Sequence, residues 1–193
     1  PVIREYIVSE ALHYLGLRST RSLAIVSTGE TVLRETPTKG GILTRVASSH
    51  IRIGTFEFFF FQKDFKSLKK LADYTINRHF PEFKQNNQYE FLLEKVIKLQ
   101  ASLVAKWMSI GFIHGVMNTD NTSICGETID YGPCAFMDQY DPNKVFSYID
   151  YAGRYSYVNQ GKIILWNLSK FAECIIPLLG ENFETSKSKA INC

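Results

Sequence analysis

The sequence lacks the features that mark several common protein classes. Its four cysteines include no Cys-x-x-Cys pair, which argues against a zinc site and favours reduced thiols. No apolar run approaches the length of a membrane span, and the first residues lack the basic-then-apolar layout of a secretory signal. We therefore expect a cytoplasmic protein that does not act on membranes, or a mitochondrial one if the source is a eukaryote.

A strong charge of one sign is also absent. The chain carries 22 Lys and Arg against 19 Asp and Glu, a formal net charge of +3 over 193 residues. Nucleic-acid binding needs clustered basic side chains, so we expect no nucleic-acid partner. The length and the 45% hydrophobic content are sufficient for one domain with a sizeable core. We place this domain at residues 1–180 and predict a polar, disordered tail at residues 181–193.

Apolar spacing and turn signals predict the helices and strands. Residues 3–15 are expected to form a helix whose buried stripe includes Ile3 and Ile7. A hairpin turn is predicted at Thr28-Gly29-Glu30, between strands at 22–28 and 31–35. The other predicted elements are a strand at 42–47 and helices at 65–79, from about 87 to 110, and at 162–179.

Most candidate functional side chains lie in one stretch, residues 114–133. A polar loop between apolar segments is a common way to present reactive groups at a cleft, and Asp120, Asn121 and Asp130 lie in this loop. Gly126 can adopt a positive φ and allow a hairpin bend between Asn121 and Asp130. The bend is predicted to bring Asp130 back beside Asn121.

The spacing within this stretch matches a pattern from phosphate chemistry. Protein kinases carry His-x-Asp, an Asn five residues after that Asp, and an Asp-Phe-Gly segment. Here His114, Asn121 and Asp130 occupy the matching places, the last within Asp-Tyr-Gly. Val116 stands where a kinase has its catalytic Asp, and Val cannot accept a proton. The pattern therefore predicts a kinase-like magnesium site without the kinase base, and Asp120 is the nearest carboxylate that could replace it.

Longer motifs carry a more specific resemblance. The segments HGVMNTDN and TIDYGP, with CAFMDQYDP and GRYSYVNQ, resemble the signature of the selenoprotein O family over about residues 1–180. The resemblance implies an α+β, protein-kinase-like (pseudokinase) fold, with part of a small-lobe sheet and a mainly helical large lobe. It also implies transfer of AMP from ATP to Ser, Thr or Tyr hydroxyls of partner proteins, with Mg²⁺ or Mn²⁺ as the metal.

The same resemblance implies roles outside the loop. Residues 44–54 are similar to the family segment R-V-A-x-S-H-I-R-x-G, in which both arginines contact nucleotide phosphates, so Arg45 and Arg52 become candidate ATP ligands. Glu5 matches a glutamate that pairs with an upstream Lys. Neither that Lys nor a Gly-rich nucleotide loop occurs in this sequence, and we expect residues 1–180 to be a fragment of the domain. The ordinary alternatives are solvated arginines and a first-turn glutamate that favours the helix dipole.

Three functional hypotheses follow. In the first, Asn121 and Asp130 hold the metal, Asp130 also contacts ATP, and Asp120 accepts the proton of the attacking hydroxyl in an adenylyltransferase. In the second, the protein is a kinase, although Val116 argues against it. In the third, it is a nucleotide-binding pseudoenzyme that acts as an interaction module. The structural alternative for Asp120 is a carboxylate that caps a turn.

Overall fold

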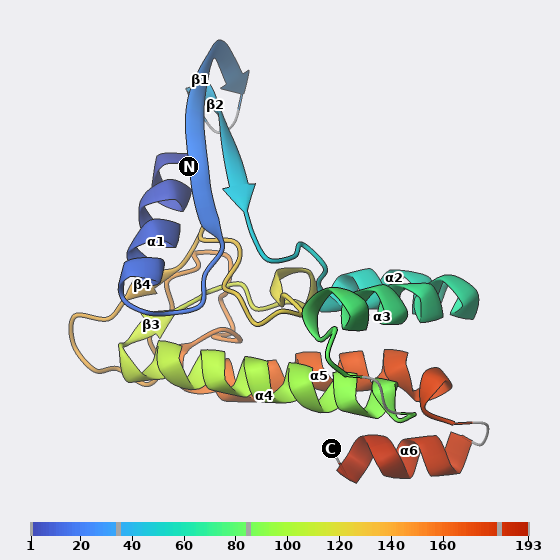
Figure 1. Cartoon of the computed structure of the whole chain (residues 1–193). Helices are drawn as coiled ribbons and strands as arrows, with labels where there is room; N and C mark the ends of the chain where they lie inside the picture. Colours follow the sequence, from blue (N-terminus) through green and yellow to red (C-terminus); the bar gives the residue numbers. More distant parts are fainter. Residues whose placement is uncertain (1, 34–35, 84–85, 181–182, 193) are drawn as a thin grey trace.

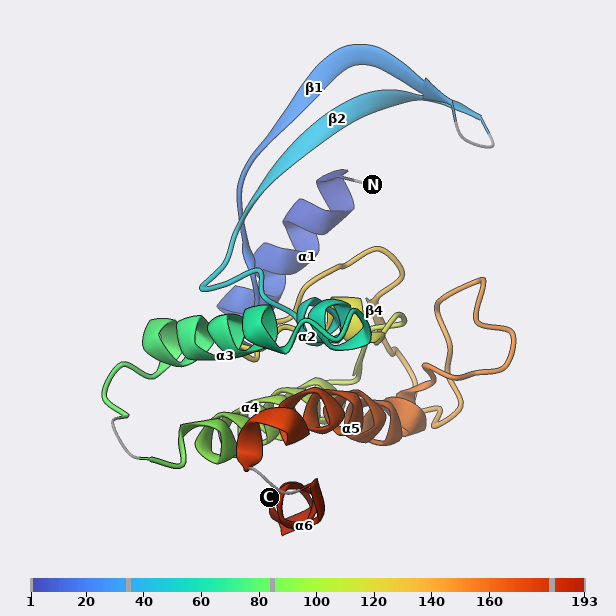
Figure 2. The same cartoon turned by 90° about the vertical axis from the view of Figure 1, so that its right-hand side faces the viewer.

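A long antiparallel hairpin rises from a layer of helices in this mixed α/β structure (Figure 1). The computed structural model describes residues 2–33, 36–83, 86–180 and 183–192. The hairpin consists of β1 (Arg21–Leu33) and β2 (Pro37–Val46), and α1 (Val2–Tyr14) lies against it. Figure 2 shows how far the two strands extend beyond the helices.

The turn predicted at Thr28-Gly29-Glu30 is wrong. The strand β1 continues through these residues, and the register with β2 shifts between Ser27 and Thr31. Gly29 has φ +75°, so a glycine in the left-handed region marks an irregularity within the strand. A glycine between β-rich runs predicts a tight turn, but it also fits a bulge. The two strands stay paired as far as Leu33 and Pro37.

The predicted buried stripe of the first helix is also wrong. Ile3 and Ile7 are 61% and 60% exposed, whereas Leu12 and Ser9 are buried. Together with the half-buried Glu5, these residues recur at helical spacing and form the face that meets the rest of the chain. The helix packs through a partly polar face because Glu5 accepts a hydrogen bond from Tyr131 of the functional loop (residues 114–134) and Ser9 bonds Ser22 of β1.

The other described helices are stacked below the hairpin in Figure 1. They are α2 (Ile53–Phe61), α3 (Phe65–His79), α4 (Gln88–Ser109), α5 (Gln160–Leu179) and α6 (Phe183–Asn192). The predicted helices at 65–79, 87–110 and 162–179 are therefore confirmed, as is the strand at 42–47 within β2. Two short strands, β3 (Phe112–Ile113) and β4 (Ala135–Phe136), pair antiparallel on either side of the functional loop.

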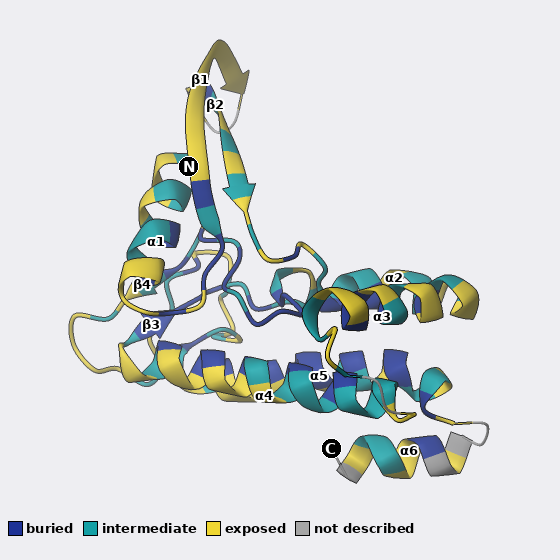
Figure 3. Cartoon of the chain, viewed as in Figure 1, coloured by how far each residue is buried: buried dark blue, intermediate teal, exposed yellow. Residues whose placement is uncertain are grey.

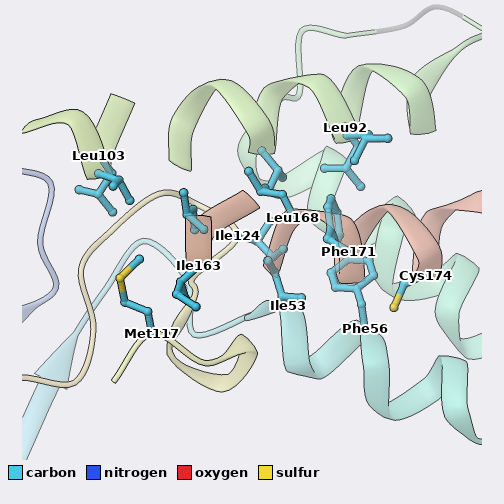
Figure 4. Packing of buried hydrophobic residues seen from close by; sticks show 14 of the residues in the cluster. Ile53, Phe56, Leu92, Leu103, Met117, Ile124, Ile163, Leu168, Phe171 and Cys174 are labelled. Carbon is cyan, nitrogen blue, oxygen red and sulfur yellow. The ribbon is translucent and has the colours of Figure 1, made fainter. Parts of the chain in front are cut away.

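The hydrophobic core lies between α2, α4 and α5 (Figures 3 and 4). Phe56 of α2 meets Phe171 of α5 edge to face, with ring centroids 5.1 Å apart. Each fully buried side chain of this size contributes roughly 1.5–3 kcal/mol of hydrophobic stabilisation. Met117 and Ile124, which come from the functional loop, belong to the same cluster. The loop is thus anchored to the core on both sides of Asp120.

Helix α6 lies in the part of the chain that was predicted to be a disordered tail. Ser186 of this helix is buried, and the Nζ of Lys189 donates to the carbonyl of Leu179 at 3.3 Å. The described part of this polar segment therefore packs against α5. Among the described helices, none has the length and apolar character needed to cross a membrane.

Candidate functional site

The functional loop leaves β3 after Ile113 and returns to β4 at Ala135. Its first half contains a short 3-10 helix, Thr119–Asn121, which places Asp120 and Asn121 side by side. The backbone N–H of Asn121 donates to the carbonyl of Asn118 at 3.0 Å. The loop is therefore an ordered turn, with its polar side chains presented from a fixed backbone.

Asn121 and Asp130 are in direct contact. The Nδ2 of Asn121 donates to Oδ2 of Asp130 at 3.0 Å and to the carbonyl of Val116, also at 3.0 Å. The intervening bend passes through Gly126 at φ +70°. The prediction that this bend brings Asp130 beside Asn121 is confirmed.

Asp130 has a strained backbone. Its φ is +68°, a left-handed conformation that is uncommon for residues other than glycine. The N–H of Gly132 donates to Oδ1 of Asp130 at 3.1 Å, so one carboxylate oxygen holds the turn and the other meets Asn121. Strain of this kind persists where the surroundings fix it, and it is concentrated at functional sites.

His114 fixes the backbone that leads to Asp130. The ring is fully buried, its Nε2 lies 2.8 Å from the carbonyl of Ile129, and its Nδ1 accepts from the N–H of Val116 at 3.3 Å. Burial lowers the pKa of His114, so the neutral ring with a proton on Nε2 fits both contacts. His114 joins the two halves of the loop and does not face a reacting group.

A pairing between distant segments brings α2 to the loop. The N–H of Ile53 donates to the carbonyl of Thr122, and the N–H of Ile124 donates to the carbonyl of Ile51, both at 3.0 Å. Arg52 lies between these bonds, and its Nε is buried without a hydrogen-bond partner among the described residues. Arg52 is therefore placed at the loop that holds Asp120, with a buried N–H donor still available.

Arg45 lies on the other side of the loop, in a network with Glu5. Its Nη2 lies 2.5 Å from Oε2 of Glu5, its Nη1 donates to Thr20 at 3.1 Å, and its guanidinium lies 5.2 Å from the ring centroid of Tyr131. The N–H of Tyr131 donates to Oε1 of Glu5 at 3.1 Å. Glu5 thus contacts Arg45 of this chain, where the sequence suggested an upstream Lys as its partner.

Tyr131 connects this network to the segment that precedes β1. Its hydroxyl lies 2.6 Å from Ser19 Oγ and 2.8 Å from Thr20 Oγ1, and it donates to the carbonyl of Thr128 at 2.6 Å. Burial raises the pKa of Tyr131 to about 12. The hydroxyl therefore stays protonated near neutral pH and has a structural role.

Arg4 was not identified from the sequence as a functional residue. Its Nε donates to the carbonyls of Tyr131 and Gly132 at 3.2 and 2.8 Å, and its Nη2 contacts the carbonyl of Cys134. With Glu5, it gives α1 two adjacent charged side chains that hold the backbone after Asp130. The sequence around Arg4 gives no distinctive signal, because most surface arginines look the same in a sequence.

Two polar residues of α5 support the loop from below and were also missed. Gln160 donates from Nε2 to the carbonyl of Phe112 and accepts at Oε1 from the N–H of His114, both at 3.0 Å. Asn167 donates from Nδ2 to the carbonyl of Met117 at 3.0 Å and to Thr122 Oγ1 at 2.8 Å. Asn167 interrupts the apolar face of α5, and such a polar residue in a buried stripe is a signal that the sequence does contain.

The donor set at Asn121 and Asp130 fits a hard cation. Among the described residues none donates to Oδ1 of Asn121, which leaves an amide oxygen next to a carboxylate. Mg²⁺ commonly binds through one or two protein oxygens and completes its coordination with phosphates and water. No group of three or more His, Cys, Asp or Glu in the described part of the chain could hold a metal alone. Such a cation would therefore need phosphate oxygens as well.

Comparison with known proteins identifies the family. The family model for protein adenylyltransferase SelO matches residues 1–190. A protein nucleotidyltransferase YdiU of Clostridium perfringens strain 13 is 62% identical over 185 residues, which cover 95% of this chain and 38% of that protein. The corresponding protein of Bradyrhizobium diazoefficiens is 59% identical over 191 residues, or 98% of this chain and 39% of its own length.

The chain therefore belongs to the protein adenylyltransferase SelO family, as its motifs indicated. A third relative, the YdiU protein of Halalkalibacterium halodurans, is 62% identical over 184 residues, which are 94% of this chain and 37% of that relative. The chain thus spans less than two fifths of the length of these curated relatives.

Proposed function

We propose that the protein to which this chain belongs transfers AMP from ATP to hydroxyl groups of Ser, Thr or Tyr in other proteins. The observation that carries the proposal is the contact between Asn121 and Asp130, with Asp120 next to it, in a chain of the adenylyltransferase family. The names of the relatives, protein nucleotidyltransferases, support the same reaction class. ATP and hydroxyl-bearing proteins are then the partners.

The proposal includes a kinase-like arrangement of the chain. The hairpin β1–β2 with α1 corresponds to part of a small lobe, and the helices α2–α6 correspond to a large lobe. The functional loop lies between these two parts in Figure 1, with its backbone bonded to both. A nucleotide held between them would meet Arg45 from β2 and Arg52 from the start of α2.

The roles of the binding residues follow from their chemistry. Asn121 Oδ1 and the Asp130 carboxylate would hold Mg²⁺ or Mn²⁺, which, when bound, neutralises phosphate charge in the transition state. The guanidinium groups of Arg45 and Arg52 would contact the phosphates, including the pyrophosphate that leaves. Arg45 keeps N–H groups for this purpose, since Glu5 and Thr20 use only part of its five donors.

Asp120 is the proposed general base. The acceptor hydroxyl loses its proton to the Asp120 carboxylate, and its oxygen forms a bond to the α-phosphorus. The bond from that phosphorus to the β-phosphate oxygen breaks, and pyrophosphate leaves. Asp120 is exposed on the loop and can therefore reach a hydroxyl of another protein, whereas Val116 has no group that could take the proton.

Labelled ATP tests the proposed reaction. The full-length protein is incubated with Mg²⁺, an acceptor such as casein, and ATP that carries the label on either the α- or the γ-phosphate. We expect protein-bound label from the α position only. Label from the γ position would identify a kinase, and ATP binding without any transfer would identify a binding-only pseudoenzyme.

A further inference from the structure

Gly54 lies directly beneath the carboxylate of Asp120. It is the second residue of α2, and a Cβ atom added there would overlap Oδ1 of Asp120. The same atom would lie 3.0 Å from Asp120 Cγ and 3.5 Å from its Cα. Since Cβ atoms rarely approach other atoms so closely, the position of this carboxylate depends on the absence of a side chain at residue 54.

The backbone around Asp120 has little freedom to yield. Asn118 accepts two bonds at its carbonyl, from the N–H of Asn121 at 3.0 Å and from Thr122 Oγ1 at 2.9 Å. Thr122 is also bonded to Ile53 of α2, which precedes Gly54. A methyl group at Gly54 would therefore displace the side chain of Asp120 rather than its backbone.

We infer that Gly54 is a positioning residue that sets where the Asp120 carboxylate meets the acceptor hydroxyl. The inference rests on the proposed role of Asp120 as proton acceptor. Gly54 has no unusual φ that would require glycine for the backbone, and α2 would tolerate alanine at this place. Glycine is less favourable than alanine within a helix, so its presence here is explained by the space it leaves and not by the stability of the fold.

Gly54→Ala should separate activity from stability. The displaced carboxylate is exposed and can turn into solvent, so the melting temperature should stay the same or rise. The rate of AMP transfer should fall by about 10-fold to 100-fold, because a shift of about 1 Å in a reacting group can cost that much. Mg–ATP affinity should remain, since the three atoms nearest to a Cβ at residue 54 all belong to Asp120.

Gly161→Ala provides the matched control. Gly161 is likewise the second residue of a helix, α5, and a Cβ there would have no atom within 4 Å. The experiment measures kcat and KM for α-labelled ATP with casein in the full-length protein and in both glycine variants. It repeats Gly54→Ala in the Asp120→Asn background. We expect a lower kcat with an unchanged KM in Gly54→Ala, no change in Gly161→Ala, and no further loss in the double variant.

Three results would overturn the inference while leaving the proposed function intact. These are wild-type kcat in Gly54→Ala, an equal loss in the Asp120→Asn background, and unfolding of the Gly54→Ala protein. Wild-type kcat in Gly54→Ala would show that the Asp120 carboxylate does not need the space left by Gly54. An equal loss in the Asp120→Asn background would show that Gly54 acts through another group. Unfolding would show that alanine at residue 54 disturbs more of the structure than Asp120. Failure of the proposed function is seen separately, as an absence of α-label transfer by the wild-type protein, and it overturns the inference too.

Discussion

Glu5 on α1 and Arg45 on β2 form an ion pair with 2.5 Å between Oε2 and Nη2, and both touch Tyr131. Each side chain is less than one-fifth exposed, so the pair is partly shielded from solvent. Through the N–H and the ring of Tyr131, it joins the hairpin, the first helix and the residue that follows Asp130. The proposed metal ligand is thus coupled to the part of the molecule that would cover the nucleotide.

Arg45→Lys tests whether the planar guanidinium is needed. Lysine keeps the charge, but it lacks the planar guanidinium whose several N–H donors can contact Glu5, Thr20 and a phosphate at the same time. We expect AMP transfer to fall by about tenfold or more, the equivalent of one charge-assisted hydrogen bond. Arg21→Lys is the control, because Arg21 bonds Glu10 through Nε and Nη2 in a similar pair between the hairpin and α1. If the Arg45→Lys and Arg21→Lys proteins both transfer AMP at the wild-type rate, Arg45 makes no contact that the reaction requires.

Asp130→Ala tests the metal site. The change removes the proposed anionic ligand and the partner of Asn121, so metal-dependent ATP binding should be lost. Isothermal titration calorimetry with Mg–ATP measures this directly, and the exposed Asp138→Ala serves as a control for loss of one negative charge. Unchanged Mg–ATP affinity in Asp130→Ala would reject the assignment of Asp130 as a ligand.

Gln160→Met tests the support beneath the loop. Methionine has a similar length but cannot bond the carbonyl of Phe112 or the N–H of His114, and both groups would be left buried and unpaired. The free energy of unfolding should fall by about 1–3 kcal/mol in chemical denaturation. The exposed Gln139→Met should change it little. A stability of Gln160→Met equal to that of wild type would mean that water replaces both bonds.

The pH dependence of stability should contain a contribution from His114. Burial lowers the pKa of His114 below its usual 6.5, so the unfolded state binds more protons in this range. This contribution to stability is therefore fully present above about pH 6.5 and is lost as the pH falls through the folded pKa. His114→Gln should reduce the slope of unfolding free energy against pH below 6.5. Burial also lowers the pKa of His79. His79→Gln is therefore measured in parallel, to separate the contribution of His79 from that of His114. An unchanged slope in His114→Gln would contradict the buried, neutral ring.

Local signals in the sequence predicted those features whose interacting residues lie close together in the chain. The helix Phe65–His79 follows from its apolar spacing, and the contact of Asn121 with Asp130 follows from a bend only a few residues long. The side of α1 that is buried could not be predicted in this way. Its inner face carries Glu5 and Ser9, and their partners lie elsewhere in the sequence.

Two features of the site depend on distant segments and were not predicted. The pairing of Glu5 with Arg45 spans 40 residues, and no local pattern distinguishes it from a pair with another cation. The contact between Gly54 and Asp120 depends on the bonds that join residues 51–53 to 122–124. The left-handed conformation of Asp130 is likewise imposed by its surroundings, since aspartate does not require it.

Asp120→Asn in the full-length protein tests the central claim most directly, by the rate of AMP transfer from α-labelled ATP to casein. Asparagine has nearly the same shape but cannot take the proton. We predict that the fold and most of the Mg–ATP affinity remain, and that the transfer rate falls by about 10²–10⁴-fold, the usual contribution of a general base. Transfer near the wild-type rate would contradict the account and make Asp120 a structural residue of the loop.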